Sequence, residues 1–306
     1  MTSSKTLKTI EYDKIKQILS DFAVLESSKR FLLDFVPLNN IDECKLLLDK
    51  TEEAYSYLYK YSLSGVYYFS DVSEELDRVD KGGVLNNVEL LRVGANLKSA
   101  RILKEGVLSV NDDNLKYLPQ LATGLYVDGE FEKEIFSKII SEDEVSDNAS
   151  DKLYKIRKNI RSLNAKIRER LNSYIHGGLN KYLQDAVITI RSQRYVIPVK
   201  SEYRSFVKGF IHDQSSTGST VFIEPAEIME LNNELRRAGF EEAEEIKQIL
   251  TDLSKKVALI SQALRYNAEI LCDCKVSIIS RNRTKEFNLV KLCPRSRAHN
   301  AVAHSS

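Results

Sequence analysis

Two long, highly charged stretches carry the same narrow apolar stripe, and this repeated pattern most constrains the fold. In residues 151–184, Leu and Ile recur at steps of three and four residues: Leu153, Ile156, Ile160, Leu163, Ile167 and Leu171. A similar stripe begins at Ile228, after Pro225, and continues to about Ile279. Such spacing places the apolar side chains along one side of a helix, as in the seam of a coiled coil. We therefore expect two long helices that pair in antiparallel fashion.

The segment between these helices has a different composition. Four short runs rich in Val, Ile, Thr, Phe and Tyr lie at residues 187–191, 194–200, 207–213 and 219–225, with turn residues between them. They predict a small antiparallel β module. Pro198 lies inside the second run, and proline cannot donate a backbone hydrogen bond, so we expect it at an edge or a bulge.

Residues before the first long helix predict a helical bundle. Apolar residues recur at helical spacing from Thr9 to Lys60 with a break at Pro37, and one helix is expected to start at about Ile41. The asparagines before "VELL" predict a capped helix from about Asn87 to Glu105. The run "GVYYF", residues 65–69, predicts a short extended piece.

The composition bounds the class of protein. With 29% charged residues and a net charge of +1, the whole chain has no basic excess, so a nucleic-acid partner requires basic charge that is concentrated locally. Four scattered cysteines do not predict a disulfide framework. The sequence has neither a signal-peptide pattern nor an apolar run of about 18 residues, so we expect a cytoplasmic protein without a membrane partner.

The residues offer no catalytic constellation. The phosphate-binding pattern G-x-x-x-x-G-K-[ST] is absent, as are G-x-S-x-G and H-E-x-x-H. Cys272 and Cys274 point away from each other in a helical pattern, and His212-Asp213 lies in a strand and turn rather than on the helix that a metal-dependent phosphohydrolase requires. We predict no catalytic residue, no cofactor and no metal in this chain.

Local basic charge is found in the β module. Residues 187–212 hold five basic residues and one acidic residue, interleaved with Tyr195 and Tyr203. Arg, Lys, hydroxyl and backbone N–H groups together suit phosphate binding, although the same residues also suit a solvated hairpin. The predicted nucleic-acid contacts are Arg191, Arg194, Lys200, Arg204, Lys208, His212, Gln214, Ser215, Ser216 and Thr217.

The first long helix is a second basic candidate. For its basic side chains we favour ion pairs with the glutamates of "FEEAEEIKQIL", residues 240–250, over nucleic-acid binding. The set comprises Lys155, Arg157, Lys158, Arg161, Lys166, Arg168 and Arg170.

The run "RYVIPVKSEYRSFVKGFIHDQSSTGSTVFIEPAEIMELNNELR", residues 194–236, strongly resembles the core and clamp region of a bacterial family. This is the MutS-type paralogue family without the mismatch-reading domain, described as endonuclease MutS-two or as recombination and DNA strand exchange inhibitor. "LDFVPLNNIDECKLLLDKTEEA" and "DKGGVLNNVELLRVGANLKSARILK" are similar to its N-terminal core. The resemblance covers about residues 10–285.

The resemblance implies a helical core and a long lever whose arms carry a β clamp. Full-length members of the family dimerise through an ATPase that uses ATP and Mg²⁺, and many carry a nuclease domain. They act in recombination suppression and, in some bacteria, in ribosome rescue. After Phe287 this chain continues as "NLVKLCPRSRAHNAVAHSS", without helical periodicity. We therefore expect a truncated member without ATPase or nuclease activity of its own.

These observations predict a mainly α protein with a helical core and a long antiparallel helical lever that carries a small antiparallel β clamp. The expected divisions are a core (1–150), an ascending lever helix (151–186), a β-rich clamp (187–225), a descending lever helix (226–285) and an aberrant or disordered tail (286–306). The clamp is expected to bind DNA, such as branched recombination intermediates, or ribosomal RNA.

The alternative is a helical scaffold or dimerisation arm that binds a protein and no nucleic acid. In that case Phe206, Phe210 and Phe222 would be exposed as one patch, whereas in a clamp they are expected to form the small core of the module.

Overall fold

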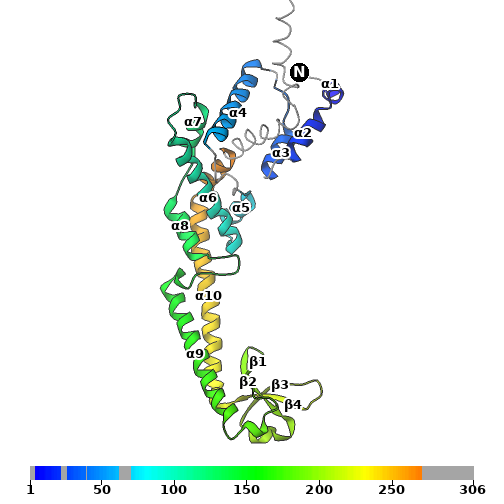
Figure 1. Cartoon of the computed structure of the whole chain (residues 1–306), viewed down its shortest axis with the longest axis vertical. Helices are drawn as coiled ribbons and strands as arrows, with labels where there is room; N and C mark the ends of the chain where they lie inside the picture. Colours follow the sequence, from blue (N-terminus) through cyan, green and yellow to red (C-terminus); the bar gives the residue numbers. More distant parts are fainter. Residues whose placement is uncertain (1–3, 22–25, 39, 62–69, 271–306) are drawn as a thin grey trace, which may run out of the picture. The chain divides into compact units, whose positions relative to one another are not determined.

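The computed structural model describes residues 4–21, 26–38, 40–61 and 70–270, and their fold is mostly helical with one small antiparallel sheet (Figure 1). The described residues divide into two compact units. The first contains residues up to Glu144 together with those from Leu253 onward, and the second is Val145–Asp252. The predicted extended piece at 65–69 and the predicted tail at 286–306 lie outside the described residues.

The first unit is built from helices, as the apolar spacing predicts. The prediction of a helix from about Ile41 is confirmed. In chain order the helices are α1 (Ser4–Thr9), α2 (Tyr12–Asp21), α3 (Glu26–Asp34), α4 (Ile41–Tyr61), α5 (Ser73–Asp80), α6 (Asn87–Leu108), α7 (Tyr117–Gly124) and α8 (Gly129–Lys138).

Helix α6 begins at the predicted asparagine cap. The Asn86 side chain accepts a hydrogen bond from Glu89 N, and the Glu89 carboxylate accepts one from Asn86 N, which forms a complete capping box. The returning chain docks on this region, because Ser254 Oγ accepts from Leu85 N at 2.9 Å. The apolar core beside it comprises Ala54, Tyr57, Ala100, Leu103, Val107, Leu118, Ala122, Leu125 and Ile270.

Two helices run side by side in the second unit (Figure 1). They are α9 (Asp151–His176) and the part of α10 (Met229–Leu259) that precedes Leu253. Their direction is antiparallel, because Ser150 Oγ donates to Glu245 at one end and Arg170 donates to the Glu227 carbonyl at the other. The predicted stripe is buried along α9, at Leu153, Ile156, Leu163, Ile167 and Leu171.

Helix α9 is shorter than predicted, and the second long helix is interrupted at residue 260. Helix α9 ends at His176 because two glycines follow, and glycine is a poor helix former. Helix α10 ends at Leu259, where Ile260 N bonds the carbonyl of Val257 three residues back, and helical structure resumes at residues 261–270. Residues 271–285 of the predicted descending helix lie outside the described residues.

The four strands are β1 (Thr189–Arg191), β2 (Arg194–Lys200), β3 (Gly209–Gln214) and β4 (Thr220–Pro225), each within about two residues of the predicted run. Their order in the sheet is β1-β2-β4-β3, and every neighbouring pair is antiparallel. The β1–β2 turn is Ser192-Gln193, both with positive φ, as in a two-residue type I′ hairpin. Three short 3₁₀ turns flank the strands: η3 (Asn180–Tyr182), η4 (Ser201–Phe206) and η5 (Ala226–Ile228). We call residues 180–225 the β module.

The prediction for Pro198 is wrong at the level of the strand, because β2 is an inner strand. The proline is tolerated because β1 begins only at Thr189, opposite Val196, and so has no residue opposite Pro198. The carbonyl of Pro198 accepts from Gln184 N on that side at 2.9 Å. The nitrogen of Pro198 therefore faces the side of β2 where no strand residue requires a backbone hydrogen-bond donor.

One face of the sheet packs on the ends of the two helices. The buried residues shared by this core are Ile167, Leu171, Ile175, Leu183, Tyr195, Ile197, Val199, Val207, Val221, Ile223 and Ile228. The long helices thus provide the hydrophobic surface that a four-stranded sheet of this size needs in order to be stable.

Candidate nucleic-acid interface

A buried carboxylate ties the β module together. The Glu224 side chain on β4 is 1% exposed, and it accepts two hydrogen bonds from Arg194 Nη1 at 2.7 and 3.0 Å. His212 Nε2 lies 2.5 Å from Glu224 Oε2, and Asn232 Nδ2 donates to Glu224 Oε1 at 2.7 Å. A buried carboxylate needs partners of this kind to offset its loss of hydration.

The network also fixes the module to α10. Arg194 Nη2 donates to Asn233 Oδ1 at 2.6 Å, and Asn232 exchanges hydrogen bonds with the backbone N–H and carbonyl of Tyr195. The Tyr195 ring is 8% exposed and its hydroxyl donates to Asn164 on α9. Arg194, His212 and Tyr195 were all considered for nucleic-acid contact, and the structure gives each of them an internal partner.

Arg191 is held against the sheet surface. Its guanidinium lies 4.4 Å from the centre of the Phe222 ring, and its Nε is 3.2 Å from Asp213 Oδ2. The Arg191 side chain is 42% exposed, so the guanidinium still reaches solvent. An arginine stacked on an aromatic ring keeps donors free for a further acceptor.

The loop after β3 is held by its own polar side chains. Gln214 Nε2 donates to the Gly218 carbonyl, Ser215 Oγ accepts from Thr220 N, and Thr217 Oγ1 bonds Ser219 Oγ. Ser216 lies exposed in the middle of this loop. These hydroxyl groups therefore act first as turn formers, as Ser and Thr commonly do.

Three of the predicted cations have no acidic partner among the residues that the structure describes. Lys200 ends β2, Arg204 lies in η4 and Lys208 precedes β3. Arg204 and Lys208 are exposed, and Lys200 is half-buried. We call them the unpaired cations. Of the five predicted basic contacts, these three are the ones whose charge no neighbour neutralises.

The phenylalanines do not form the core of the module, so the prediction made for a clamp is wrong, and the exposure of two of them agrees with the alternative of a protein-binding scaffold. Phe206 is 58% exposed, Phe210 is 59% exposed, and Phe222 is half-buried under Arg191. The core is formed instead by aliphatic residues of β2 and β4 that face the helices. Alternation along β3 and β4 fixes this result, since Phe210 and Phe222 point to the sheet face opposite Ile223.

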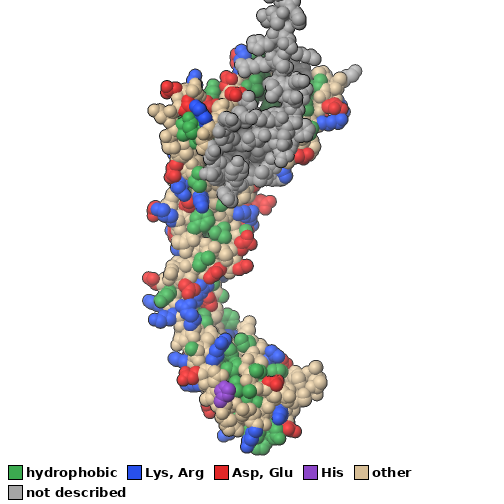
Figure 2. Space-filling view, in the orientation of Figure 1, with side chains coloured by type: hydrophobic (Ala, Val, Ile, Leu, Met, Phe, Trp, Pro, Cys, Tyr) green, Lys and Arg blue, Asp and Glu red, His purple; other side chains and the backbone are tan. Residues whose placement is uncertain are grey.

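An aromatic cluster includes two residues of η4, the turn that also carries Arg204. Tyr182 of η3 stacks on Phe206 of η4, with ring centres 5.0 Å apart and planes 19° apart. Tyr203 completes the cluster, with its ring centre 5.2 Å from that of Tyr182 and 6.1 Å from that of Phe206. Figure 2 shows basic and hydrophobic side chains next to one another on the visible face of the unit that holds the strands. Tyr182 was missed by the sequence reasoning, which considered only tyrosines inside the predicted strands and turns.

The prediction for the basic side chains of α9 is confirmed in part. Arg157 Nε donates to Glu242 of α10 at 2.7 Å. Arg161 and Arg157 both donate to Asp147, and these guanidinium groups hold the pKa of Asp147 below its usual value. Four of the predicted set are exposed and make no ion pair with any described residue: Lys155, Lys158, Lys166 and Arg168. Four cations of α9 therefore remain outside the ion pairs between the helices.

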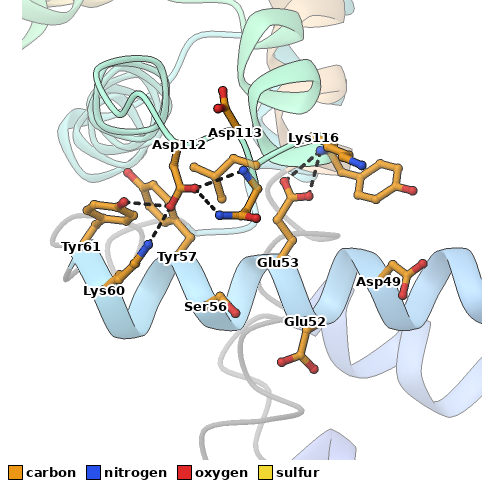
Figure 3. A pocket seen from close by; sticks show the side chains of 13 residues that line it. Asp49, Glu52, Glu53, Ser56, Tyr57, Lys60, Tyr61, Asp112, Asp113 and Lys116 are labelled. Carbon is orange, nitrogen blue, oxygen red and sulfur yellow. Dashed lines mark hydrogen bonds and ion pairs between the residues drawn. The ribbon is translucent and has the colours of Figure 1, made fainter.

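The first unit has a polar cavity of about 620 Å³ between α4 and the segment before α7 (Figure 3). Two of its acidic residues, Glu53 and Asp112, have structural roles. Glu53 accepts hydrogen bonds from the backbone N–H groups of Tyr117 and Leu118. Lys60 donates to Asp112, which holds the pKa of Asp112 far below its usual value. Within the described residues, no group of three or more His, Cys, Asp and Glu side chains could hold a metal ion.

The fold and the interface thus define a helical protein with a small antiparallel sheet whose surface is basic and partly aromatic. No family model matches the chain. Proteins named "Endonuclease MutS2" are similar to it. The one from Clostridioides difficile is 40% identical over 272 residues, 88% of this chain and 34% of the relative. Those from Clostridium botulinum (strain Eklund 17B) and Agathobacter rectalis are 38% and 39% identical over 94% of this chain, covering 37% and 36% of their own lengths.

The chain belongs to the MutS2 family, which confirms the resemblance that its residues carry. It spans about a third of the length of these relatives. None of the helices in the described part of the chain combines the length and the apolar character needed to cross a membrane.

Proposed function

We propose that this chain binds nucleic acid through its β module and contributes that binding to a DNA-related function of MutS2-type proteins. The observation that carries the proposal is the set of unpaired cations. Lys200, Arg204 and Lys208 occupy consecutive parts of one rigid module, and the described residues offer them no acidic partner. Positive charge without an internal partner is the usual basis of phosphate recognition.

Internal pairing divides the predicted contacts into two groups. Arg194 and His212 stabilise the module from within through Glu224. The unpaired cations, together with exposed Ser216 and the exposed donors of Arg191, are available to phosphate oxygens. Contacts of this kind carry no base information, so branched DNA and ribosomal RNA both fit the proposal.

The wider activity of full-length proteins is a further part of the proposal. We infer that in such proteins this portion acts as a lever and clamp, joined to an ATPase that uses ATP and Mg²⁺ and that brings two copies together. Recombination suppression and ribosome rescue are the processes in which such a clamp would act. The 306 residues contain no G-x-x-x-x-G-K-[ST] motif, so any nucleotide binding of this type belongs to other parts of those proteins.

The test is equilibrium binding of a fluorescent four-way DNA junction and of purified ribosomes across a salt series. Neutralising Lys200, Arg204 and Lys208 to Ala should lower affinity at low salt and reduce the slope of log K against log salt by about 2 to 3, since each lost phosphate contact removes about 0.7 to 0.9.

The matched control is a triple variant with the same change in charge, at Lys14, Lys133 and Lys247. These side chains are 71%, 77% and 70% exposed and lie outside the β module. This control should keep the wild-type slope. Equal slopes for wild type and the Lys200/Arg204/Lys208 variant, or no binding to either ligand, would contradict the proposal.

A second candidate function is self-association through the edge of the sheet. Phe210 is 59% exposed and Ile211 is 53% exposed on β3, which is an edge strand. Exposed apolar residues on an unpaired edge favour pairing with another chain. Sedimentation analysis of the wild type and of a Phe210→Ser, Ile211→Thr variant tests it. A dimer that the variant abolishes supports this function, and a monomeric wild type excludes it.

A further inference from the structure

We infer that the aromatic cluster of Tyr182, Tyr203 and Phe206 is a stacking site for unpaired bases, so that the β module prefers single-stranded or locally unpaired nucleic acid over continuous duplex. This inference rests on the proposed function and names its substrate class. Single-stranded DNA and single-stranded RNA share the required chemistry, which is a flat base attached to a phosphate backbone.

The geometry of the cluster leaves much of Phe206 exposed. Tyr182 and Phe206 form a nearly parallel stack, with planes 19° apart, and Lys181 Nζ lies 4.9 Å from the centre of the Tyr182 ring. Phe206 is nevertheless 58% exposed. Tyr182 stacks on Phe206 and Tyr203 meets the same ring at 66°, and the surface of Phe206 that stays exposed can receive a further planar group such as a base.

The backbone of η4 fixes this arrangement. Residues three apart eclipse each other in a 3₁₀ turn, so Tyr203 and Phe206 project from the same side of η4 (Ser201–Phe206). Lys200 stands three residues before Tyr203 and ends strand β2. The two rings and the cation therefore start from the end of β2 and the 3₁₀ turn that follows it.

The charge next to the rings suits a nucleic-acid backbone. Arg204 lies between the two aromatic residues of η4, and Lys208 follows Phe206 by two residues, both exposed and without an acidic partner among the described residues. Aromatic platforms flanked by basic side chains bind single strands, because the rings stack on bases while the cations follow the phosphates. The bases of a continuous duplex are already stacked on one another, and the rings could reach them only if the duplex opened.

An apolar protein segment is the other occupant that exposed rings could attract. Charge favours the polyanion, because Lys181 lies over the Tyr182 ring and three further cations lie within three residues of Tyr203 or Phe206 in the sequence: Lys200, Arg204 and Lys208. Glu202 is the one acidic residue inside η4. A protein partner would have to bring several carboxylates to the same corner.

The experiment compares single-stranded oligo(dT), oligo(rU) and a duplex, each of about 20 nucleotides or base pairs, which exceeds the site of one small module. Phe206→Ala should lower affinity for both single strands about tenfold and leave the duplex affinity within about twofold. Phe240→Ala is the matched control, since Phe240 is 63% exposed on α10 and lies outside the cluster. It should leave all three affinities unchanged. Tighter binding of oligo(rU) would identify the ligand as RNA, and tighter binding of oligo(dT) would identify it as DNA.

Phe206→Trp supplies a direct readout. The chain contains no Trp, so this residue would be the sole tryptophan and would keep a ring that can stack. Its fluorescence should be quenched by single strands and not by duplex, and single-strand affinity should stay near that of the wild type. A merely structural role for Phe206 predicts no quenching.

The outcomes separate this inference from the proposed function. Salt-dependent duplex binding with no effect of Phe206→Ala on single strands, and no quenching, would overturn the stacking site and leave phosphate binding intact. Absence of binding to all three ligands would overturn both.

Discussion

The guanidinium of Arg194 and the carboxylate of Glu224 form a two-hydrogen-bond ion pair inside the β module, with N–O distances of 2.7 and 3.0 Å. The Glu224 side chain is 1% exposed and that of Arg194 is 16% exposed. This pair joins two neighbouring strands of the sheet and, through Asn232 and Asn233, attaches them to α10. Arg194 thus stabilises the β module that carries the unpaired cations.

Removing one member of this pair should destabilise the module strongly. In Arg194→Met, Glu224 keeps only His212 and Asn232 as partners, and its buried charge is poorly compensated. We expect a loss of about 3–5 kcal/mol in the free energy of unfolding, measured by urea denaturation followed by circular dichroism. The control combines Arg194→Met with Glu224→Leu, which removes both charges and should be closer in stability to the wild type than the single variant. A single variant within about 1 kcal/mol of the wild type would contradict this role.

The local elements of this fold were predictable, and the partners of individual side chains were not. Helices α4 and α6, and the strands of the β module, follow from apolar periodicity and capping residues that lie within a few positions of one another. The end of α9 was placed too late, because apolar residues recur beyond the two glycines that follow His176, and the interruption of α10 at residue 260 was not predicted. Periodicity records which face is apolar and not where the helix stops.

The interface shows the same limit. Tyr182 meets Phe206 across about 20 residues of intervening sequence that fold as a hairpin, and no local pattern signals that contact. One feature of the sequence could have predicted that Arg194 has an internal partner. Glu224 is the one acidic residue in the apolar run "STVFIEP", and a lone carboxylate in such a strand usually requires a buried basic partner.

Glu53 should act as a distant cap for helix α7. Its carboxylate is the acceptor for the N–H groups of Tyr117 and Leu118, at the start of that helix, and the residue is 8% exposed (Figure 3). Glu53→Ala leaves these donors without a partner, and we expect a loss of about 1–2 kcal/mol in unfolding free energy. Asp49→Ala is the control, because Asp49 is exposed on the same helix and lines the same cavity. Equal stability of the two variants would refute the capping role.

Asp112 should make the stability of the first unit sensitive to acid. Hydrogen bonds from Lys60, then from the backbone and side chain of Asn114 and from Tyr61, hold the pKa of Asp112 below its ordinary value of 3.8. The folded state therefore binds fewer protons at low pH than the unfolded state. The stabilisation by Asp112 is fully present above pH 3.8 and is lost as the pH falls through the lower pKa that Asp112 has in the folded protein.

Asp112→Asn should therefore lower the thermal midpoint at pH 7, and the gap to the wild type should narrow as the pH falls below 3.8. Asp113→Asn, a change at the exposed neighbouring position, serves as the control and should show a smaller gap at pH 7. A difference in thermal midpoint between Asp112→Asn and the wild type that stays constant from pH 7 to below pH 3.8 would show that the carboxylate charge is not the stabilising feature.

Two glycines of the β module should respond differently to alanine. At Gly209, which begins β3, an added Cβ would lie against the carbonyl oxygen of Glu224 and 2.8 Å from its carbonyl carbon, so the β3–β4 pairing itself would have to shift. At Gly218 the nearest atom is the end of the Gln214 side chain, at 3.3 Å, but φ is +72°. We expect Gly218→Ala to cost about 1 kcal/mol from backbone strain. Gly209→Ala should cost about 2–3 kcal/mol because backbone atoms cannot move aside. Urea denaturation of both variants tests this order, and the reverse order would mean that the close approach of β3 to β4 is relieved at little cost.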